Sequence, residues 1–180
     1  PADVVIDSLV QGVFVRSQRD ESVIDLALGN RLAFARDCGA TEALIFDEHV
    51  VETIAELTED RLGDVVIDVT GSTSSPAIAA QIVRPLGTFI MAGSTVTPTV
   101  ELPWNELVRK EARVHGVNSH DQEAVRAAIE IAASNQYPLD RMVTNRYALA
   151  EASNALRQVR DASTTNGVIK AVLDPTLVNQ

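Results

Sequence analysis

The run at residues 64–69, Asp-Val-Val-Ile-Asp-Val, constrains the fold more than any other feature of this sequence. A strand with one solvated face alternates apolar and polar side chains, whereas a strand covered on both faces is an almost continuous apolar run. The run at residues 64–69 lacks such alternation. It therefore predicts a strand inside a parallel sheet, with both faces of the sheet covered.

Similar apolar runs alternate with amphipathic stretches along most of the chain. Strands are predicted at residues 4–6, 22–26, 43–46, 88–92 and 113–117, and helices at residues 31–38, 50–57, 75–82, 104–110 and 121–134. Pro76 favours the first turn of one helix, and Gly39 favours the end of another. Strands that alternate with helices at this spacing form βαβ units with right-handed crossovers. The sequence therefore predicts an α/β fold with a mostly parallel sheet.

The last forty residues differ from this alternation. An extended piece, a helix and a final strand are predicted at residues 141–147, 150–159 and 167–173. Pro138 and the polar turn at residues 163–166 bracket this unit. We therefore divide the chain into residues 1–138, which carry the large sheet, and residues 139–180, which form a separate layer.

Charge and composition exclude several classes of protein. The 180 residues carry 15 Lys and Arg against 25 Asp and Glu, a formal net charge of −10. Contacts with nucleic-acid phosphates or an anionic membrane surface need clustered Lys and Arg. The single cysteine, Cys38, leaves no disulfide framework and no Cys-rich zinc site. No apolar run reaches the ~18 residues of a membrane span, and the first residues lack the basic start of a signal peptide. We expect a cytoplasmic protein that binds neither nucleic acid nor membranes.

Asp25 ends the second predicted strand and is the first candidate ligand-binding residue. Open parallel sheets bind ligands at the carboxyl ends of their strands. A carboxylate there accepts hydrogen bonds from both hydroxyls of an adenosine ribose and repels a 2′-phosphate. The alternative is a helix N-cap or a solvated acid, and position alone does not separate the two interpretations.

Two further strand ends carry glycine. Residues 69–72 are Val-Thr-Gly-Ser, and residues 92–94 are Ala-Gly-Ser. Glycine lets a ligand approach the backbone, and the helix predicted from Ser75 brings a mildly electropositive N-terminus to the first of these ends. An ordinary turn is the alternative in each case. Three such ends beside one another favour a ligand site.

Other chemical signatures are weak. His49, His115 and His120 have no partner at metal-ligand spacing, and no G-x-S-x-G motif of a hydrolase occurs. Cys38 lies on the apolar side of its predicted helix, without a cationic neighbour that would activate the thiol. We interpret these residues as surface or packing residues.

Four segments resemble the medium-chain, zinc-type alcohol dehydrogenase family in their order and spacing. They are R-L-x-x-A-x-x-x-G-A at residues 31–40, D-V-V-I-D-x-T-G-S at residues 64–72, R-P-x-G-x-x-x-x-x-G at residues 84–93 and the closing strand at residues 167–173. The resemblance covers residues 22–174. It implies a Rossmann-like doubly wound parallel sheet, followed by a short C-terminal segment from a second, catalytic domain.

The resemblance implies a cofactor site for NAD. Asp25 would bind the adenosine ribose and favour NAD over NADP, and Arg31 would lie over the ribose or adenine. Val69 and Thr70 would line the adenine and ribose side, with Gly71 next to them.

The same resemblance places the other end of the cofactor and a subunit interface. Ala92, Gly93 and Ser94 would border the nicotinamide, and Lys170 would reach the pyrophosphate as a point charge. Residues 95–117 would extend one sheet across two subunits, so a homodimer or higher homo-oligomer is expected.

The glycine-rich turn that the family places after its first strand is missing. That turn, G-x-G-x-x-G, lets the pyrophosphate approach the next helix, whereas here only Gln11-Gly12-Val13-Phe14 occurs. Thirteen positions separate Gly12 from Asp25, and a parallel crossover by itself needs about a dozen residues. The first βαβ unit is therefore shortened, or residues are missing between Gly12 and Glu21.

The family's catalytic zinc ligands and proton relay lie in a part that precedes this domain, and this sequence contains neither. Zinc in that family polarises the alcohol oxygen so that hydride can leave. The leading hypothesis is a truncated or incomplete chain of an NAD(H)-dependent oxidoreductase acting on a small-molecule alcohol or polyol. Zinc is possible in the full-length parent, without ligands in this chain, and the zinc-free quinone reductase-like branch stays open.

Two other functions are compatible with the sequence. The missing glycines favour a non-catalytic Rossmann-like binding or dimerisation module, which would keep the sheet and lose the cofactor. Another nucleotide-using α/β enzyme, such as a methyltransferase, also places an acid after its second strand. The match through the last strand argues against that second alternative.

Overall fold

The computed structural model describes residues 13–16, 23–27, 30–45, 47–94, 97, 99–162 and 168–177. A six-stranded sheet with the order β3-β2-β1-β4-β5-β6 forms its centre. The strands are β1 (Val13–Arg16), β2 (Val23–Ala27), β3 (Glu42–Ile45), β4 (Gly63–Asp68), β5 (Val83–Met91) and β6 (Arg113–Gly116). This order is that of the Rossmann fold. The strand predicted at residues 4–6 lies outside the described residues.

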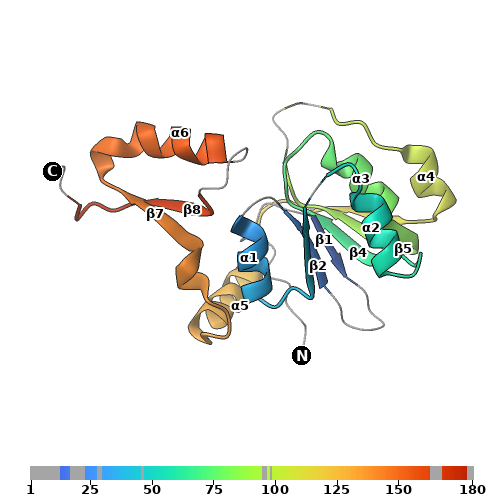
Figure 1. The fold of residues 1–180 in the computed structure, drawn as a ribbon, viewed down its shortest axis with the longest axis horizontal. Coiled ribbons are helices and arrows are strands. Elements are labelled where there is room, and N and C mark those ends of the chain that lie inside the picture. The colour runs from blue at the N-terminus through green and yellow to red at the C-terminus, as the bar shows by residue number, and fades with distance from the viewer. Residues whose placement is uncertain are drawn as a thin grey trace.

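Five helices flank the sheet, and their positions confirm the helical periodicity of the sequence. They are α1 (Asn30–Asp37), α2 (Val50–Leu57), α3 (Ser75–Ile82), α4 (Trp104–Arg109) and α5 (Gln122–Ala133). Figure 1 shows α2, α3 and α4 on one side of the sheet, and α1 and α5 on the other. The predicted α/β fold with a parallel sheet is therefore confirmed, with one exception in β1.

β1 runs antiparallel to both of its neighbours. Val13 pairs with Leu26 of β2 and with Asp68 of β4, whereas Arg16 pairs with Val23 and Val65. The pairs β2–β3, β4–β5 and β5–β6 are parallel. Six residues, 17–22, connect β1 to β2, and a connection of this length joins antiparallel strands but is too short for a parallel crossover. The first unit is therefore a hairpin connection and not a βαβ unit.

β5 begins five residues before the predicted strand at residues 88–92. Its first residue, Val83, pairs with Gly63, and the register then shifts so that Thr88 pairs with Val65. Leu86, within the shifted stretch, has φ of 60° and donates its N–H to the carbonyl of Lys110 at 2.7 Å. The prediction missed this part because Pro85 and Gly87 are unfavourable in a regular strand.

One face of the sheet carries the main hydrophobic core. Its strand residues Val15, Val66 and Phe89 have at most 1% of their surface exposed. They pack against residues of α2, α3 and α4, namely Val50, Ile54, Ala79, Ala80, Ile82 and Leu107. The alternation of side chains along a strand places Val65, Ile67 and Ile90 on the opposite face.

The described residues cover the opposite face only partly, whereas the sequence predicted cover on both faces. Val65, Ile67 and Ile90 are half-buried, and α5 buries none of its residues. The physical reason is the short β1–β2 connection, which cannot return a helix across this face. Residues 64–69 thus carry apolar side chains on both faces of the sheet, although the described residues bury only one of these faces fully.

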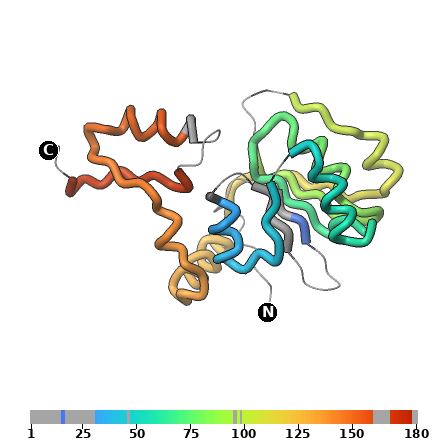
Figure 2. The backbone as a smooth tube through the Cα atoms, in the orientation of Figure 1, coloured from blue at the N-terminus to red at the C-terminus, as the bar shows by residue number. Residues whose placement is uncertain are grey.

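A second, two-stranded sheet follows α5. It consists of β7 (Val143–Tyr147) and β8 (Lys170–Leu173), which pair in parallel, with η1 (Leu139–Met142) before it and η2 (Leu149–Glu151) and α6 (Ala152–Ala162) between the strands. The prediction of an extended piece at residues 141–147 was wrong for its first two residues, which belong to η1. Figure 2 shows this unit, orange to red, beside α1. The division of the chain at residues 138 and 139 into two domains stays a prediction.

A packing contact and an ion pair hold the C-terminal unit against α1. Met142 packs against Phe34, and this pair extends the small cluster that includes Ile67 and Ile169. Arg141 forms an ion pair with Asp37 at 2.7 Å. Because these contacts involve one side of α1, the C-terminal unit covers part of the open face of the sheet.

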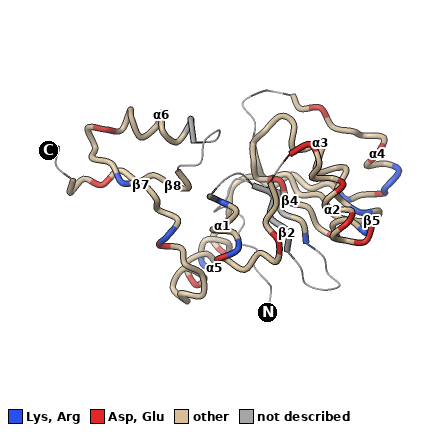
Figure 3. Tube along the Cα trace, in the orientation of Figure 1, with Lys and Arg blue, Asp and Glu red and all other residues tan. Residues whose placement is uncertain are grey.

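Charged residues of both signs are interspersed over the two units, as Figure 3 shows. At the start of the core strands, Arg84 forms an ion pair with Asp64. None of the helices that the structure describes is long and apolar enough to cross a membrane.

Candidate functional site

The carboxyl end of β4 is organised around Asp68, which is 4% exposed. Its Oδ1 accepts hydrogen bonds from the backbone N–H of Thr70 at 2.9 Å and from the Thr70 hydroxyl at 2.7 Å. Its Oδ2 accepts a hydrogen bond from the Ser75 hydroxyl at 2.7 Å. A buried carboxylate needs such partners because it has lost its hydration. Asp68 therefore fixes the turn between β4 and α3.

Asp68 also holds the end of the neighbouring strand. Its backbone carbonyl accepts hydrogen bonds from the N–H groups of Ala92 and Gly93, both at 2.9 Å. One residue thus contacts the segment that follows β4 and the segment that follows β5. We call residues 69–72 and 92–94 together the two strand-end loops.

Glycines allow the two strand-end loops to touch. A Cβ atom at Gly93 would lie 2.4 Å from the backbone nitrogen of Gly71, and a Cβ atom at Gly71 would lie 2.8 Å from the carbonyl oxygen of Ser94. Gly71 also has φ of +66°, a conformation that favours glycine. Ser94 is exposed, and Thr70, Gly71 and Gly93 are partly exposed. The arrangement leaves the two strand-end loops partly exposed at the carboxyl edge of the sheet.

Asp25 lies elsewhere on the sheet. It pairs with Phe14 of β1 and with Ala43 of β3, and β2 continues two residues further, to Ala27. The prediction that Asp25 closes its strand was therefore wrong, because parallel pairing with β3 extends to Ile45. β1 lies between β2 and β4. A ribose-binding role of Asp25 stays a prediction.

Arg31 faces the C-terminal unit. The residue is 9% exposed at the start of α1, and one guanidinium nitrogen, Nη2, donates to the carbonyl of Val168 at 3.2 Å. Its Nε has no hydrogen-bond partner, and burial lowers the pKa of the guanidinium below its ordinary value. The structure therefore places Arg31 in the contact between α1 and the C-terminal unit.

Lys170 belongs to the second sheet. It is exposed, it pairs with Val143, and its carbonyl accepts a hydrogen bond from the Thr144 hydroxyl at 3.4 Å. Of the predicted site residues, the structure brings together Val69, Thr70, Gly71, Ala92, Gly93 and Ser94. Asp25, Arg31 and Lys170 lie on three other elements.

The inverted β1 determines which parts of a dinucleotide fit this edge. Val13 pairs with Asp68, so the first residue of β1 lies at the edge of the strand-end loops, and its last residue, Arg16, lies at the opposite edge. A pyrophosphate-binding turn of the Rossmann type follows a parallel first strand and leads into a helix. This chain has no such turn at that edge in the residues described. Nucleoside binding at the strand-end loops and pyrophosphate binding beside β1 both stay predictions.

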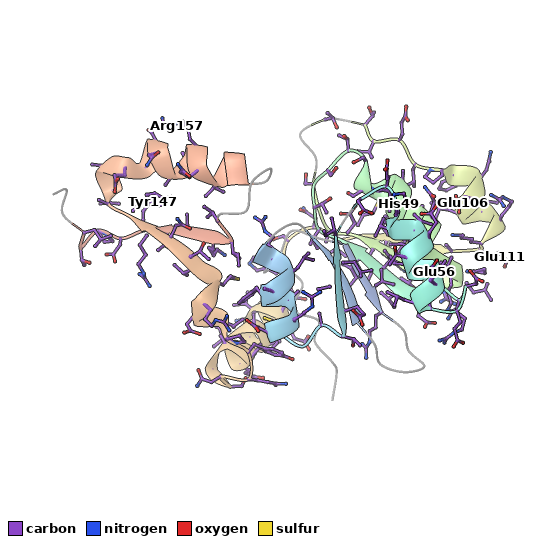
Figure 4. All side chains as sticks on the ribbon, in the orientation of Figure 1. His49, Glu56, Glu106, Glu111, Tyr147 and Arg157 are labelled. Atoms are coloured by element: carbon purple, nitrogen blue, oxygen red, sulfur yellow. The ribbon has the colours of Figure 1, made fainter. Side chains whose placement is uncertain are left out.

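Metal-ligating groups do not gather in the described part of the chain. No set of three or more His, Cys, Asp or Glu residues there is arranged to hold an ion. His49 lies exposed before α2, with its Nε2 3.6 Å from a carboxylate oxygen of Glu48 (Figure 4). His115 and His120 are also exposed.

Sequence reasoning missed Asp68 and Ser75, the two buried residues that hold the strand-end loops. The available signal was the one used for Asp25, namely an acid at the end of an apolar strand. For Asp68 this acid is followed by Val-Thr-Gly-Ser, residues 69–72. The network becomes visible only once β4 is known to end at residue 68 and α3 to begin at Ser75.

Comparisons with known proteins agree with this fold. The family model described as zinc-binding dehydrogenase matches residues 23–134. A sorbitol dehydrogenase of Bombyx mori is 32% identical over 132 residues, covering 71% of this chain and 37% of the relative. An alcohol dehydrogenase structure from Thermotoga maritima has a TM-score of 0.69 at 25% identity, covering 83% of this chain and 41% of that chain.

A structure of a short chain alcohol dehydrogenase from Escherichia coli in complex with NADH also shares the fold. Its TM-score is 0.71 at 17% identity, covering 85% of this chain and 44% of that chain. The chain thus spans about two fifths of the length of these relatives. The family model covers more than half of the chain, and the strand order of the large sheet is that of the Rossmann fold, the fold that the resemblance implied. The chain therefore belongs to the zinc-binding dehydrogenase family of alcohol dehydrogenase-like oxidoreductases.

Proposed function

We propose that this chain is part of an NAD(H)-dependent oxidoreductase that transfers hydride between an alcohol or polyol and NAD. The family membership supports the reaction class, and the strand-end loops support a nucleoside-binding role for the chain. A relative by fold is bound to NADH. The contribution of this chain would be to bind and orient the cofactor, with Val69, Thr70 and Gly71 on one side and Ala92, Gly93 and Ser94 on the other.

The observation that carries the proposal is the contact between Gly71 and Gly93. The Cβ position of Gly93 lies 2.4 Å from the Gly71 nitrogen, so any side chain there would push the loops apart. Open α/β sheets bind ligands outside the carboxyl ends of their strands, and the two strand-end loops lie at this edge of the sheet. When bound, NAD supplies the hydride acceptor. The residues of this chain would orient the nicotinamide and exclude water from one side of it.

Asp25, Arg31 and Lys170 complete the proposal as more distant contributors. Asp25 would bind the adenosine ribose, and Lys170 would approach the pyrophosphate, for which the β1 side offers no turn. Arg31 would have to exchange its hydrogen bond with Val168 for one with the cofactor. Zinc, where the parent uses it, would be bound by residues outside the described part of this chain.

Titration of the chain with NADH, followed by the fluorescence of the reduced nicotinamide, tests the proposal. We expect saturable binding that Gly93→Ala weakens at least about tenfold, because a displaced loop loses several contacts with the cofactor. Gly116→Ala is the matched control, since nothing lies within 4 Å of a Cβ atom at Gly116. Equal affinities of the two variants, or no binding by the unmodified chain, would refute the proposal.

A non-catalytic binding or dimerisation module is the second candidate, and the inverted β1 favours it. An antiparallel first strand removes the turn that would hold the pyrophosphate, while the sheet itself stays intact. β6 is an edge strand of the described sheet, and Val117 next to it is exposed. A chain that sediments as a dimer and leaves NADH fluorescence unchanged would select this function.

A further inference from the structure

We propose that Asp68 is a positioning residue for the cofactor, acting through Thr70 and Ser75; this inference rests on the proposed function. Asp68 is 4% exposed and thus lies beneath the surface that a ligand would touch. Its two carboxylate oxygens and its carbonyl oxygen accept hydrogen bonds from groups in or next to both strand-end loops. It therefore determines where the loops lie relative to one another.

Burial forces this arrangement. A carboxylate removed from water needs hydrogen bonds to remain stable. The donors to the Asp68 carboxylate are the Thr70 N–H, the Thr70 hydroxyl and the Ser75 hydroxyl, and no ion pair with a described cation accompanies them. Opening either loop would leave an oxygen of Asp68 without a partner. The buried acid therefore penalises opening of the loop at residues 69–72, and the close approach of Gly71 and Gly93 couples the loop at residues 92–94 to it.

Ser75 connects Asp68 to the turn after β4. Its side chain is 1% exposed, and its hydroxyl lies 2.7 Å from Oδ2 of Asp68 and 2.5 Å from the hydroxyl of Thr70. The Thr70 hydroxyl in turn accepts a hydrogen bond from the N–H of Ser72 at 3.0 Å. These contacts fix the side-chain rotamer of Thr70 and the path of the backbone through Gly71. Because Ser75 is covered, any effect of its removal on ligand affinity has to pass through this network.

The consequence is a site that is ordered before the ligand arrives. A pre-ordered loop does not lose conformational freedom when it binds, and this saving increases affinity without a new contact. Pre-ordering of these loops would matter more than usual, because the described residues include no pyrophosphate turn beside β1. The strand-end loops would then supply a large share of the affinity for the cofactor.

Ser75→Ala tests the inference, with Ser74→Ala as the matched control. Ser74 is exposed, and its hydroxyl contacts that of Ser72 at 3.0 Å but forms no hydrogen bond with Asp68, Thr70 or Ser75. NADH affinity is measured by fluorescence titration without denaturant, after circular dichroism has shown that both variants are folded. We expect Ser75→Ala to weaken NADH binding about tenfold, the ratio that corresponds to one hydrogen bond to a charged group. Ser74→Ala should bind NADH as the unmodified chain does.

Amide hydrogen exchange provides the readout that is independent of the cofactor. In Ser75→Ala, and in the isosteric Asp68→Asn, we expect faster exchange at the N–H groups of Thr70, Ala92 and Gly93, with the core of β5 unchanged. Unchanged exchange at these three groups would overturn the positioning role, whether or not the chain binds NADH. Faster exchange together with an unchanged NADH affinity would also overturn it, because the order of the loops would then not serve binding. Failure of the unmodified chain to bind NADH would instead refute the proposed function.

Discussion

The two faces of the large sheet differ although the same strands form both. Val66 on β4 is completely buried against α2 and α3, whereas its neighbour Val65 points to the other face and is only half-buried. The same contrast holds on β5 between Phe89 and Ile90. Because adjacent residues of one strand share their backbone environment, the difference comes from what covers each face.

The helices on the buried face belong to connections that are long enough to contain a helix. The open face lacks such a helix because the connection between β1 and β2 is short. α3 follows β4 and returns to β5 by a parallel crossover, and α2 precedes β4. The β1–β2 connection has six residues and joins antiparallel strands. The short connection thus leaves one face of the sheet less covered. The strand order and the hydrophobic core on the other face remain those of the Rossmann fold.

The C-terminal unit compensates for part of this loss. Met142 and Ile169 approach Phe34 of α1 and Ile67 of β4, so the open face is closed at the end nearest the strand-end loops. α5 does not close the remainder, since Val125 and Ile129 are exposed. The open face therefore has a packed end and an unpacked end.

Truncation of the largest buried side chain gives the largest expected effect. Phe89→Ala should lower the free energy of unfolding by about 4 kcal/mol, because it removes a fully buried aromatic ring and leaves a cavity. Urea unfolding followed by circular dichroism measures it. A loss below about 1 kcal/mol would mean that the core collapses around the site and that the buried face is less rigid than its packing implies.

The matched pair Val66→Ala and Val65→Ala compares the two faces directly. We expect a loss of about 2 kcal/mol for Val66→Ala and less than half of that for Val65→Ala, because only Val66 leaves a closed cavity. The same unfolding measurement applies to both variants. Equal losses would contradict the comparison and indicate that a second molecule covers the open face in solution.

The ion pair between the C-terminal unit and α1 should contribute less to the free energy of unfolding than these buried side chains do. Arg141 and Asp37 lie 2.7 Å apart, with side chains 61% and 38% exposed. Arg141→Ala should therefore cost about 0.5 kcal/mol, an effect that decreases further at high salt. Its measurement at two salt concentrations separates the Coulombic part from lost packing. A loss that salt does not change would assign the contribution to the aliphatic part of the side chain.

Substitution on the outer side of α5 should have almost no effect. Ile129 is 62% exposed, and Ile129→Ser should change the free energy of unfolding by no more than about 0.5 kcal/mol. The chain concentration is varied in the same experiment. A larger loss that grows with chain concentration would show that the exposed side of α5 is buried between copies of the chain.

The two strand-end loops could be predicted from the sequence, and the reason is local. Gly71 and Gly93 follow apolar runs, and the rule that ligands bind at the carboxyl ends of parallel strands places them together. Asp25, chosen by the same rule, is not at the end of its strand, because pairing with β3 extended β2. Arg31 was placed at the cofactor, whereas the structure turns it toward Val168, a contact between residues 137 positions apart that no local pattern reveals.

The sequence by itself determined the alternation of helices and strands, the α/β class, the family and the glycine loops, because periodicity and turn residues act over a few positions. Only the tertiary structure decided the direction of β1, the uneven cover of the two faces and the role of Asp68. The length of one connection controls strand direction through chain geometry. The hydrogen bonds of Asp68 depend on Thr70, Ser75, Ala92 and Gly93 converging from two loops. Such convergence exists only after the strands have paired.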